Sequence, residues 1–247
     1  PTLAGGFLFG VGMVLAGGCV VGTLYKMAAG NLTNWIGFGG ILAGSLLYAE
    51  VHPWIRRIAE KTTFIEALTV GQGHPLSQTL LLAILLAGGG MMIGRWLRRG
   101  ELTVTAYARG YLQPWRVAVI LALVNFCYYA LTGSPMGVTT AFAKIAAYLE
   151  QLVLPGHVAA LSYFQEDSVV FRVGGSLLSG GAGPRLDYIS VTELALVAGI
   201  FLGALAGALY YREFRIYGLP PWRQGSAALL GGMLLAFGAR LASGCNV

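Results

Sequence analysis

Two short segments near the ends of the chain place a cysteine directly after a glycine. The first reads Ala16-Gly17-Gly18-Cys19 and the second reads Ala242-Ser243-Gly244-Cys245. Because glycine lowers helix propensity and has no side chain, we expect each helix to end or break there, so that the thiol projects into a cavity. A thiol is a soft, polarizable group with a weak S–H donor, which suits a soft, sulfur-containing ligand. Gly18, Cys19, Gly244 and Cys245 are therefore predicted binding residues; the alternative is that both cysteines only fill space.

The two segments belong to a longer internal match. Residues 5–21 align without gaps on residues 231–247, and nine of the 17 pairs are identical. The identical pairs include three glycine pairs in register with the Gly-Cys pair, which apolar helices do not match by composition alone. Internal duplication is common in transporters, where the site lies at the interface of the repeats. The alternative is two unrelated glycine-rich packing helices.

Cys127 is the third cysteine of the chain. It lies in Asn125-Phe126-Cys127-Tyr128-Tyr129 and lacks a preceding glycine. It is either a third thiol on the same path or a packing residue, and the sequence favours neither.

Three basic residues lie in positions that could attract an anion. Arg240 is five residues before Cys245, inside an apolar run, and its counterpart in the first repeat is Val14. Charged residues inside membrane spans are costly and usually face the protein interior or a water-filled path. Lys26 follows the first motif, and Lys144 follows Gly137-Val138-Thr139-Thr140, where a helix starting near Thr139 would point amides at an anion. The alternative for Arg240 is that it extends to the interface or binds a buried carbonyl.

The elements that position these residues are membrane helices. The 247 residues are 56% hydrophobic and only 11% charged, against roughly 25% charged in soluble domains. A spanning helix needs ~20 mostly apolar residues. We expect spans at residues 3–24, 32–51, 76–93, 115–131, 191–211 and 227–245. The predicted fold is an all-α integral membrane bundle with two pseudo-symmetric halves, forming a single transport domain over residues 1–247.

Two regions between the spans carry charged side chains. Residues 52–77 are predicted to form an amphipathic or interfacial segment. Residues 133–189 are predicted to contain re-entrant or interfacial helices, which the membrane tolerates only where they are buried in protein or line water. Arginine-rich loops at 95–116 and 212–223 are expected on the cytoplasmic side by the positive-inside rule. The chain starts at Pro1 and stops two residues after Cys245, so we expect both termini to be truncated.

Several classes of function are disfavoured. The net charge of +6 comes from loop residues without interleaved aromatics, so no nucleic acid is expected. The three histidines, His52, His74 and His157, are far apart and lack metal-ligand spacing. No phosphate-binding loop, nucleophile elbow or Cys-Xaa-Xaa-Cys pair is present. We therefore expect no metal, no cofactor and no enzymatic activity.

At Leu15-Ala16-Gly17-Gly18-Cys19, with Gly30-Asn31-Leu32, and at the segment from Gly238 to Asn246, the sequence resembles the YeeE/YedE family of bacterial inner-membrane proteins. The resemblance implies an all-helical, multi-pass membrane protein associated with thiosulfate uptake or, in some members, selenium metabolism. It implies that cysteines along a central path contact thiosulfate in turn. By position, Cys19 and Cys245 fit the motif cysteines and Cys127 is the remaining candidate. A cytoplasmic TusA-like sulfurtransferase is the implied partner, besides membrane lipid.

The leading hypothesis is an inner-membrane permease for thiosulfate or a related sulfur or selenium oxyanion. Basic residues would attract the anion and thiols would pass it along weak sites, because conduction needs binding that is favourable but not deep. One alternative is a membrane-embedded thiol sulfurtransferase or redox enzyme, which would need an activated thiolate. Another is a membrane subunit that does not transport and only docks a sulfur-carrier protein.

Overall fold

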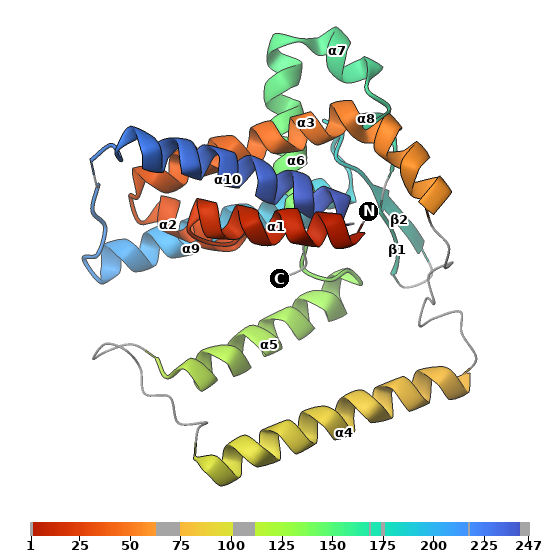
Figure 1. The fold of residues 1–247 in the computed structure, drawn as a ribbon, viewed down its shortest axis with the longest axis vertical. Coiled ribbons are helices and arrows are strands. Elements are labelled where there is room, and N and C mark those ends of the chain that lie inside the picture. The colour runs from red at the N-terminus through yellow and green to blue at the C-terminus, as the bar shows by residue number, and fades with distance from the viewer. Residues whose placement is uncertain are drawn as a thin grey trace. The chain divides into compact units, whose positions relative to one another are not determined.

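The computed structural model describes residues 2–62, 75–100, 112–167, 169–173, 176–216 and 218–242. The chain divides into two compact units, residues 1–62 with 128–247, and residues 63–127. The helices of the first unit are α1 (Thr2–Ala16), α2 (Val20–Ala28), α3 (Leu32–Thr62), α6 (Thr139–Val153), α7 (Pro155–Ala160), α8 (Ser162–Gln165), the π-helix η1 (Ser190–Leu194), α9 (Ala195–Tyr210) and α10 (Trp222–Leu241) (Figure 1). A hairpin of β1 (Val169–Val173) and β2 (Ser176–Gly180) completes it.

The helical membrane fold is confirmed, with the hairpin as its one described departure from all-α structure. Four segments of the described chain are long and apolar enough to cross a membrane: Thr2–Ala28, Leu32–Ala59, Pro114–Thr132 and Ser190–Tyr210. The spans expected at 76–93 and 227–245 fall on α4 (Pro75–Arg99) and α10. Helix α10 packs against both α1 and α3, so less of its surface faces lipid and it needs fewer apolar side chains (Figure 1).

Glycines on facing helices bring α10 into backbone contact with α3. A Cβ added at Gly40 or Gly44 of α3 would collide with the carbonyl oxygen of Leu229 or Met233, and one at Gly232 would collide with that of Gly37. Small residues let membrane helices approach closely, since lipid supplies no hydrophobic force that drives helices together. The buried core beside this contact contains Ile41, Leu235 and Ala236.

The contact between α1 and α10 is symmetric: the close approaches of glycines between these two helices occur in pairs, and in each pair the two aligned positions have changed places. A Cβ at Gly12 would lie 2.5 Å from the Leu235 amide nitrogen, and a Cβ at Gly238 would lie 2.5 Å from the Phe9 amide nitrogen. The alignment of the two repeats pairs Gly12 with Gly238 and Phe9 with Leu235. The same exchange relates the close approach of Gly5 to Ala242 and that of Gly231 to Ala16.

The direction of this contact follows from its residue pairs. Positions near the start of α1 lie against the end of α10, so the two helices run antiparallel. An antiparallel pair that maps onto itself has the symmetry of an inverted-topology repeat. The two starts of the cysteine motifs, Ala16 and Ala242, consequently lie at opposite ends of the pair, 11 residues or about 16 Å apart along the axis at about 1.5 Å per residue.

The expected interfacial segment at 52–77 begins as a direct continuation of a membrane helix. Helix α3 runs unbroken through Pro53 to Thr62. Its 31 residues correspond to about 46 Å, well beyond the ~30 Å hydrocarbon core. The charged residues of its last turns therefore belong to the part that projects from the membrane, and residues 63–74 lie outside the described chain.

The described part of region 133–189 contains three helices, α6, α7 and α8, and a β-hairpin. Re-entrant or interfacial helices were predicted for this region, and for Val169–Val173 and Ser176–Gly180 the prediction was wrong. Strands β1 and β2 pair antiparallel, with Val169 opposite Gly180 and Val173 opposite Ser176. Two glycines, 174 and 175, stand between the strands in the sequence, which is a common pattern for a tight hairpin turn. Whether α6, α7 or α8 re-enters the membrane stays a prediction.

The second unit contains α4 and most of α5 (Pro114–Thr132). Helix α4 ends in Arg98 and Arg99 before Gly100, which has a positive φ of 67°. Helix α5 has no buried residue within the described chain. The single transport domain over 1–247 and the pseudo-symmetry of its halves remain predictions beyond the α1–α10 contact.

Candidate functional site

Cys19 lies in a sharp turn between α1 and α2. Helix α1 ends in a Schellman motif, in which the Gly18 amide donates to the Met13 carbonyl (3.0 Å) and the Gly17 amide to that of Val14 (3.4 Å). Gly17 takes a φ of 73°, the left-handed conformation that favours glycine. Gly18 was the predicted binding residue of this motif, but the glycine that turns the chain is Gly17.

The thiol of Cys19 is the N-cap of α2. Its Sγ accepts a hydrogen bond from the Gly22 amide at 3.3 Å, and the side chain is exposed within the described chain. The Cys19 carbonyl also accepts from Thr23 Oγ1 (3.1 Å). The turn thus fixes the sulfur at the positive end of a helix and leaves it accessible to a ligand.

Lys26 reaches back along α2 to the same turn. Its Nζ donates to the Gly17 carbonyl at 2.8 Å, and a Cβ at Gly18 would lie 3.6 Å from it. Lys26 also lines an open depression of about 450 Å³ at the other end of α2, together with Ala29, Asn31, Arg212, Glu213 and Arg215. Lys26 therefore lies between Cys19 and a depression that is lined by three cationic side chains, its own included, and one acidic side chain.

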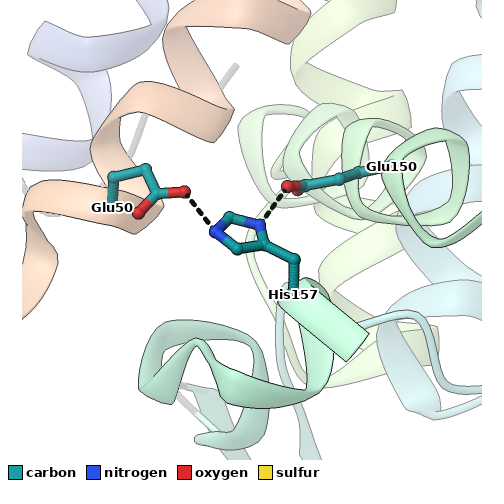
Figure 2. A group of neighbouring side chains, drawn as sticks. All are labelled: Glu50, Glu150 and His157. Atoms are coloured by element: carbon teal, nitrogen blue, oxygen red, sulfur yellow. Dashed lines mark hydrogen bonds and ion pairs between the residues drawn. The ribbon is translucent and has the colours of Figure 1, made fainter. Parts of the chain in front are cut away.

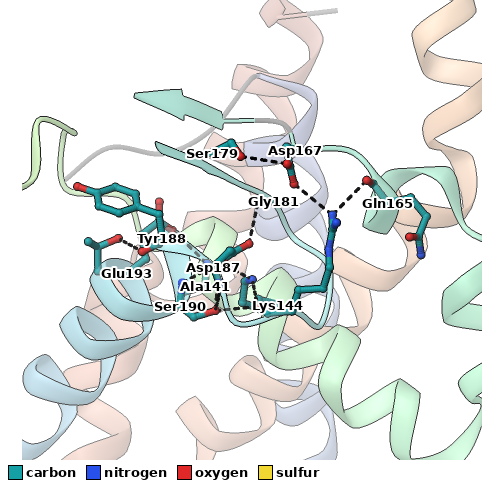
Figure 3. Close-up of polar contacts among 12 residues, drawn as sticks. Ala141, Lys144, Gln165, Asp167, Ser179, Gly181, Asp187, Tyr188, Ser190 and Glu193 are labelled. Carbon is teal, nitrogen blue, oxygen red and sulfur yellow. Dashed lines mark hydrogen bonds and ion pairs between the residues drawn. The ribbon is translucent and has the colours of Figure 1, made fainter. Parts of the chain in front are cut away.

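Lys144 is fully buried in α6 and balanced by a carboxylate. Its Nζ lies 2.7 Å from Asp187 Oδ1 and donates to the Arg185 carbonyl at 2.7 Å (Figure 3). Asp187 also accepts from the amides of Gly181 and Ser190, both at 3.0 Å. Burial alone would raise the pKa of Asp187, but the hydrogen bonds from Lys144 and the two amides outweigh it and hold the pKa below its usual range. This pair ties the segment after the hairpin to α6.

Glu193 is a buried acid that the sequence interpretation did not select. It lies in η1, is 7% exposed, and its Oε2 accepts from the Ala141 amide at 3.1 Å in the first turn of α6 (Figure 3). A Cβ at Gly137 would come within 2.6 Å of Oε1. Single π-turns inside helices are frequently found at functional sites. The carboxylate thus takes the place of the side-chain cap that Val138 does not provide.

Arg240 approaches the same end of α6 from α10. Its Nη1 is 3.4 Å from Thr140 Oγ1, whereas Nε and Nη2 are buried and have no hydrogen-bond partner among the described residues. Its charge acts on Glu193 and on Tyr163, which is 6% exposed. The Tyr163 hydroxyl also lacks a partner in the described chain, and burial raises its pKa so that it keeps its proton. We call Thr140, Tyr163, Glu193 and Arg240 the Arg240 cluster.

The structure brings some predicted residues together and leaves others apart. Cys19, Gly18 and Lys26 form one group, and Lys144 and Arg240 lie at the same end of α6. Cys127 belongs to the second unit, so its relation to the other cysteines stays a prediction. Gly244 and Cys245 lie outside the described residues. Glu193 was missed because its partner Ala141 is 52 positions away in the sequence, and the neighbour of the predicted Arg240, Thr140, is 100 positions away.

One group of side chains has the composition of a metal site. Within the described residues, ligand atoms of Glu50, Glu150 and His157 lie within 4.8 Å of one another. His157 Nδ1 lies 2.6 Å from Glu150 and Nε2 lies 3.0 Å from Glu50, so the imidazole bridges the two carboxylates (Figure 2). Because both ring nitrogens are engaged on opposite sides, a protonated histidine satisfies the group, and a metal ion would have to displace the ring.

This bridge predicts a pH-dependent stability. The hydrogen bond with Glu150 raises the pKa of His157, opposed by a smaller desolvation effect. Because the pKa of His157 is higher in the folded state than in the unfolded state, the protonated ring contributes its full stabilisation below the unfolded-state pKa of about 6.5. This contribution is lost as pH rises through the folded-state pKa. We expect the Tm of the purified protein to fall over this range, and to fall less in His157→Gln. Equal pH dependence in both proteins would show that the bridge does not contribute.

Comparison with known proteins agrees with this helical architecture. The sulphur transport family matches residues 1–247, the whole chain, which confirms the resemblance to YeeE/YedE proteins. The thiosulfate transporter TsuA of Escherichia coli (strain K12) is 26% identical over 253 residues, which cover all of this chain and 65% of that protein. TsuA of Spirochaeta thermophila is 26% identical over 252 residues, covering 67% of its length.

A further relative matches a shorter part. The probable transporter YedE of Salmonella typhimurium is 32% identical over 102 residues, or 40% of this chain and 24% of that protein. The chain spans about two thirds of the length of the two TsuA proteins. These relatives are named as transporters and not as enzymes, and the match to the family extends over every residue. The chain is a membrane protein that belongs to the sulphur transport family.

Proposed function

We propose that this protein is an inner-membrane permease that takes up thiosulfate, with the Arg240 cluster as an anion site and Cys19 as one of its thiol contacts. The observation that carries the proposal is the pair of Arg240 nitrogens that are buried without a partner in the described chain. Leaving a buried donor unpaired is expensive, and more so for a charged group. A guanidinium offers two parallel N–H groups that match an oxyanion.

The surroundings of Arg240 fit a small anion with several acceptor atoms. Tyr163 keeps a proton that it can donate, and the first turn of α6 supplies backbone amides. The Lys144 charge is already balanced by Asp187, so Arg240 is the cation of this cluster whose N–H groups remain available within the described chain. Lys144 stays a predicted binding residue, with a role in holding α6 in place.

The repeat supports a path with several weak sites. The two motif starts lie at opposite ends of the α1–α10 pair, so a thiol near each end could contact the substrate in turn. Sites that bind weakly and in series allow an anion to leave as readily as it enters. Cys19, Cys127 and Cys245 are the proposed thiols, and Lys26 with its basic depression would receive the anion beside Cys19. The two TsuA relatives, by their names, support thiosulfate as the substrate.

Uptake by the purified protein tests the proposal. Proteoliposomes with this protein should accumulate radiolabelled thiosulfate faster than protein-free liposomes, and unlabelled thiosulfate should compete better than sulfate. Competition by selenite would extend the substrate range to selenium oxyanions. Absence of uptake and of exchange would contradict the permease and favour a subunit that docks a TusA-like sulfur carrier. A persulfide trapped on Cys19 during turnover, seen by mass spectrometry, would instead favour a thiol sulfurtransferase.

Removing the charge of Arg240 should weaken substrate binding. A hydrogen bond to a charged group contributes about 1.5–3 kcal/mol, and each 1.4 kcal/mol is about tenfold in affinity. We expect Arg240→Gln to raise the KM for thiosulfate at least about tenfold in the liposome assay. Arg223→Gln is the matched control, because Arg223 lies exposed in the first turn of the same helix. An unchanged KM in Arg240→Gln would remove Arg240 from the site.

A further inference from the structure

Glu193 occupies a position that an incoming anion would also need. Its carboxylate accepts the Ala141 amide in the first turn of α6, and its negative charge interacts with that of Arg240. The amide and the guanidinium are two of the donors that the proposed anion site offers, besides the Tyr163 hydroxyl. An ionised Glu193 therefore competes with the substrate for the amide, and an oxyanion beside it would meet like-charge repulsion.

Among the charged and titratable groups described around Glu193, only Arg240 carries a charge that can offset the repulsion between Glu193 and an anion. These groups come from each element packed near Glu193: Arg240 of α10, Asp187 of the preceding loop with its partner Lys144 of α6, Tyr128 of α5 and Tyr163 of α8. Lys144 and Asp187 neutralise each other, and both tyrosines are uncharged. With Glu193 ionised, Arg240 and Glu193 sum to zero; with Glu193 protonated, the cluster carries one net positive charge.

We propose that Glu193 binds a proton together with the anion, so that transport by this protein is a proton–anion symport. Protonation places the proton on the carboxylate, weakens its hydrogen bond with the Ala141 amide and removes the like-charge repulsion, while Nε and Nη2 of Arg240 already lack a partner within the described chain. Binding of the anion favours the proton by the same factor, because coupling between two sites is reciprocal. This inference rests on the proposed function and adds the energy source to it.

Coupling to a proton also suits the direction of uptake. Thiosulfate is a dianion, and a membrane potential that is negative inside opposes its entry in proportion to the net charge that moves. One proton carried with each dianion halves that charge. A buried acid beside the anion site is placed to carry that proton together with the anion.

Lumenal pH in proteoliposomes tests the symport directly. With a pH-sensitive dye enclosed and an inward thiosulfate gradient, the wild-type protein should acidify the lumen, and an outside pH below the inside pH should speed uptake severalfold. Glu193→Gln, whose amide oxygen can still accept the Ala141 N–H, should lose both the acidification that accompanies each thiosulfate taken up and the stimulation by external pH. Glu166→Gln, which removes an exposed acid paired with Arg56, should behave as wild type.

The outcomes separate the two proposals. Thiosulfate uptake by the wild-type protein without lumenal acidification would overturn the symport and leave the permease standing, and this measurement does not depend on any variant. Acidification by Glu193→Gln at the wild-type rate would also overturn the role of Glu193. Absence of both uptake and exchange in the wild-type protein would instead contradict the proposed function itself.

Discussion

Replacing Cys19 with alanine should abolish thiosulfate uptake while the protein remains in the membrane at its normal level. The substitution removes the sulfur that caps α2 and is accessible in the turn. Loss of an N-cap costs about 0.5–2 kcal/mol with good capping residues, and a sulfur is a weak acceptor, so the fold should tolerate the change. The measurement is radiolabelled uptake in proteoliposomes, normalised to the amount of folded protein.

Cys19→Ser separates the thiol from the cap. Serine is a better N-cap than cysteine, so this variant keeps or improves the start of α2 but lacks the soft sulfur. We expect it to fail in uptake like the alanine variant. The repeat predicts the same loss for Cys245→Ala, at a position outside the described residues. Normal uptake in Cys19→Ala would contradict a thiol contact at this position.

Gly12→Ala should destabilise the protein strongly, although alanine is the better helix former. The added Cβ would lie 2.5 Å from the Leu235 amide nitrogen and 2.8 Å from the Gly231 carbonyl oxygen. Overpacking costs about 1–3 kcal/mol, against a gain of at most ~1 kcal/mol from helix propensity. Both colliding atoms are backbone atoms, so the two helices must separate. A drop in Tm of the detergent-solubilised protein would measure the effect.

The same helix provides a control of opposite sign. Nothing lies within 4 Å of a Cβ at Gly10, so Gly10→Ala should leave the Tm unchanged or raise it. Gly238→Ala should cost about as much as Gly12→Ala, because its surroundings are the exchanged counterparts of the same atoms. A Tm of Gly12→Ala equal to that of Gly10→Ala would contradict the close contact of α1 and α10.

The features that sequence predicted well are those encoded locally. The break at Gly17-Gly18-Cys19 depends on one turn, and the structure ends α1 at Ala16 and starts α2 at Val20. The repeat was visible because both of its copies are present in the chain. Two of the glycine pairs that matched in sequence, Gly5 with Gly231 and Gly12 with Gly238, pack α1 against α10, whereas Gly6 has no neighbour within 4 Å and Gly232 packs against α3.

The features that sequence missed depend on distant partners or on competing signals. Glu193 reads as one acid at the start of an apolar run, and only the fold places it against Ala141, 52 positions earlier in the chain. Lys144 reads as a free cation until Asp187 is placed beside it. The β-hairpin was missed because each of its strands has only five residues, and their pairing across the turn is a tertiary feature that a reading of apolar runs does not detect.

The exchange symmetry of α1 and α10 has a consequence for the energies of transport. In a carrier built on inverted repeats, the states open to either side are related by swapping the repeats, so identical repeats would make them equally populated. Any preference must come from positions where the repeats differ. Arg240 is such a position, since its counterpart Val14 is uncharged and 82% exposed. In the proposed permease, Arg240 would therefore distinguish the two ends of the α1–α10 pair, and an anion bound to it would shift the balance between the two states.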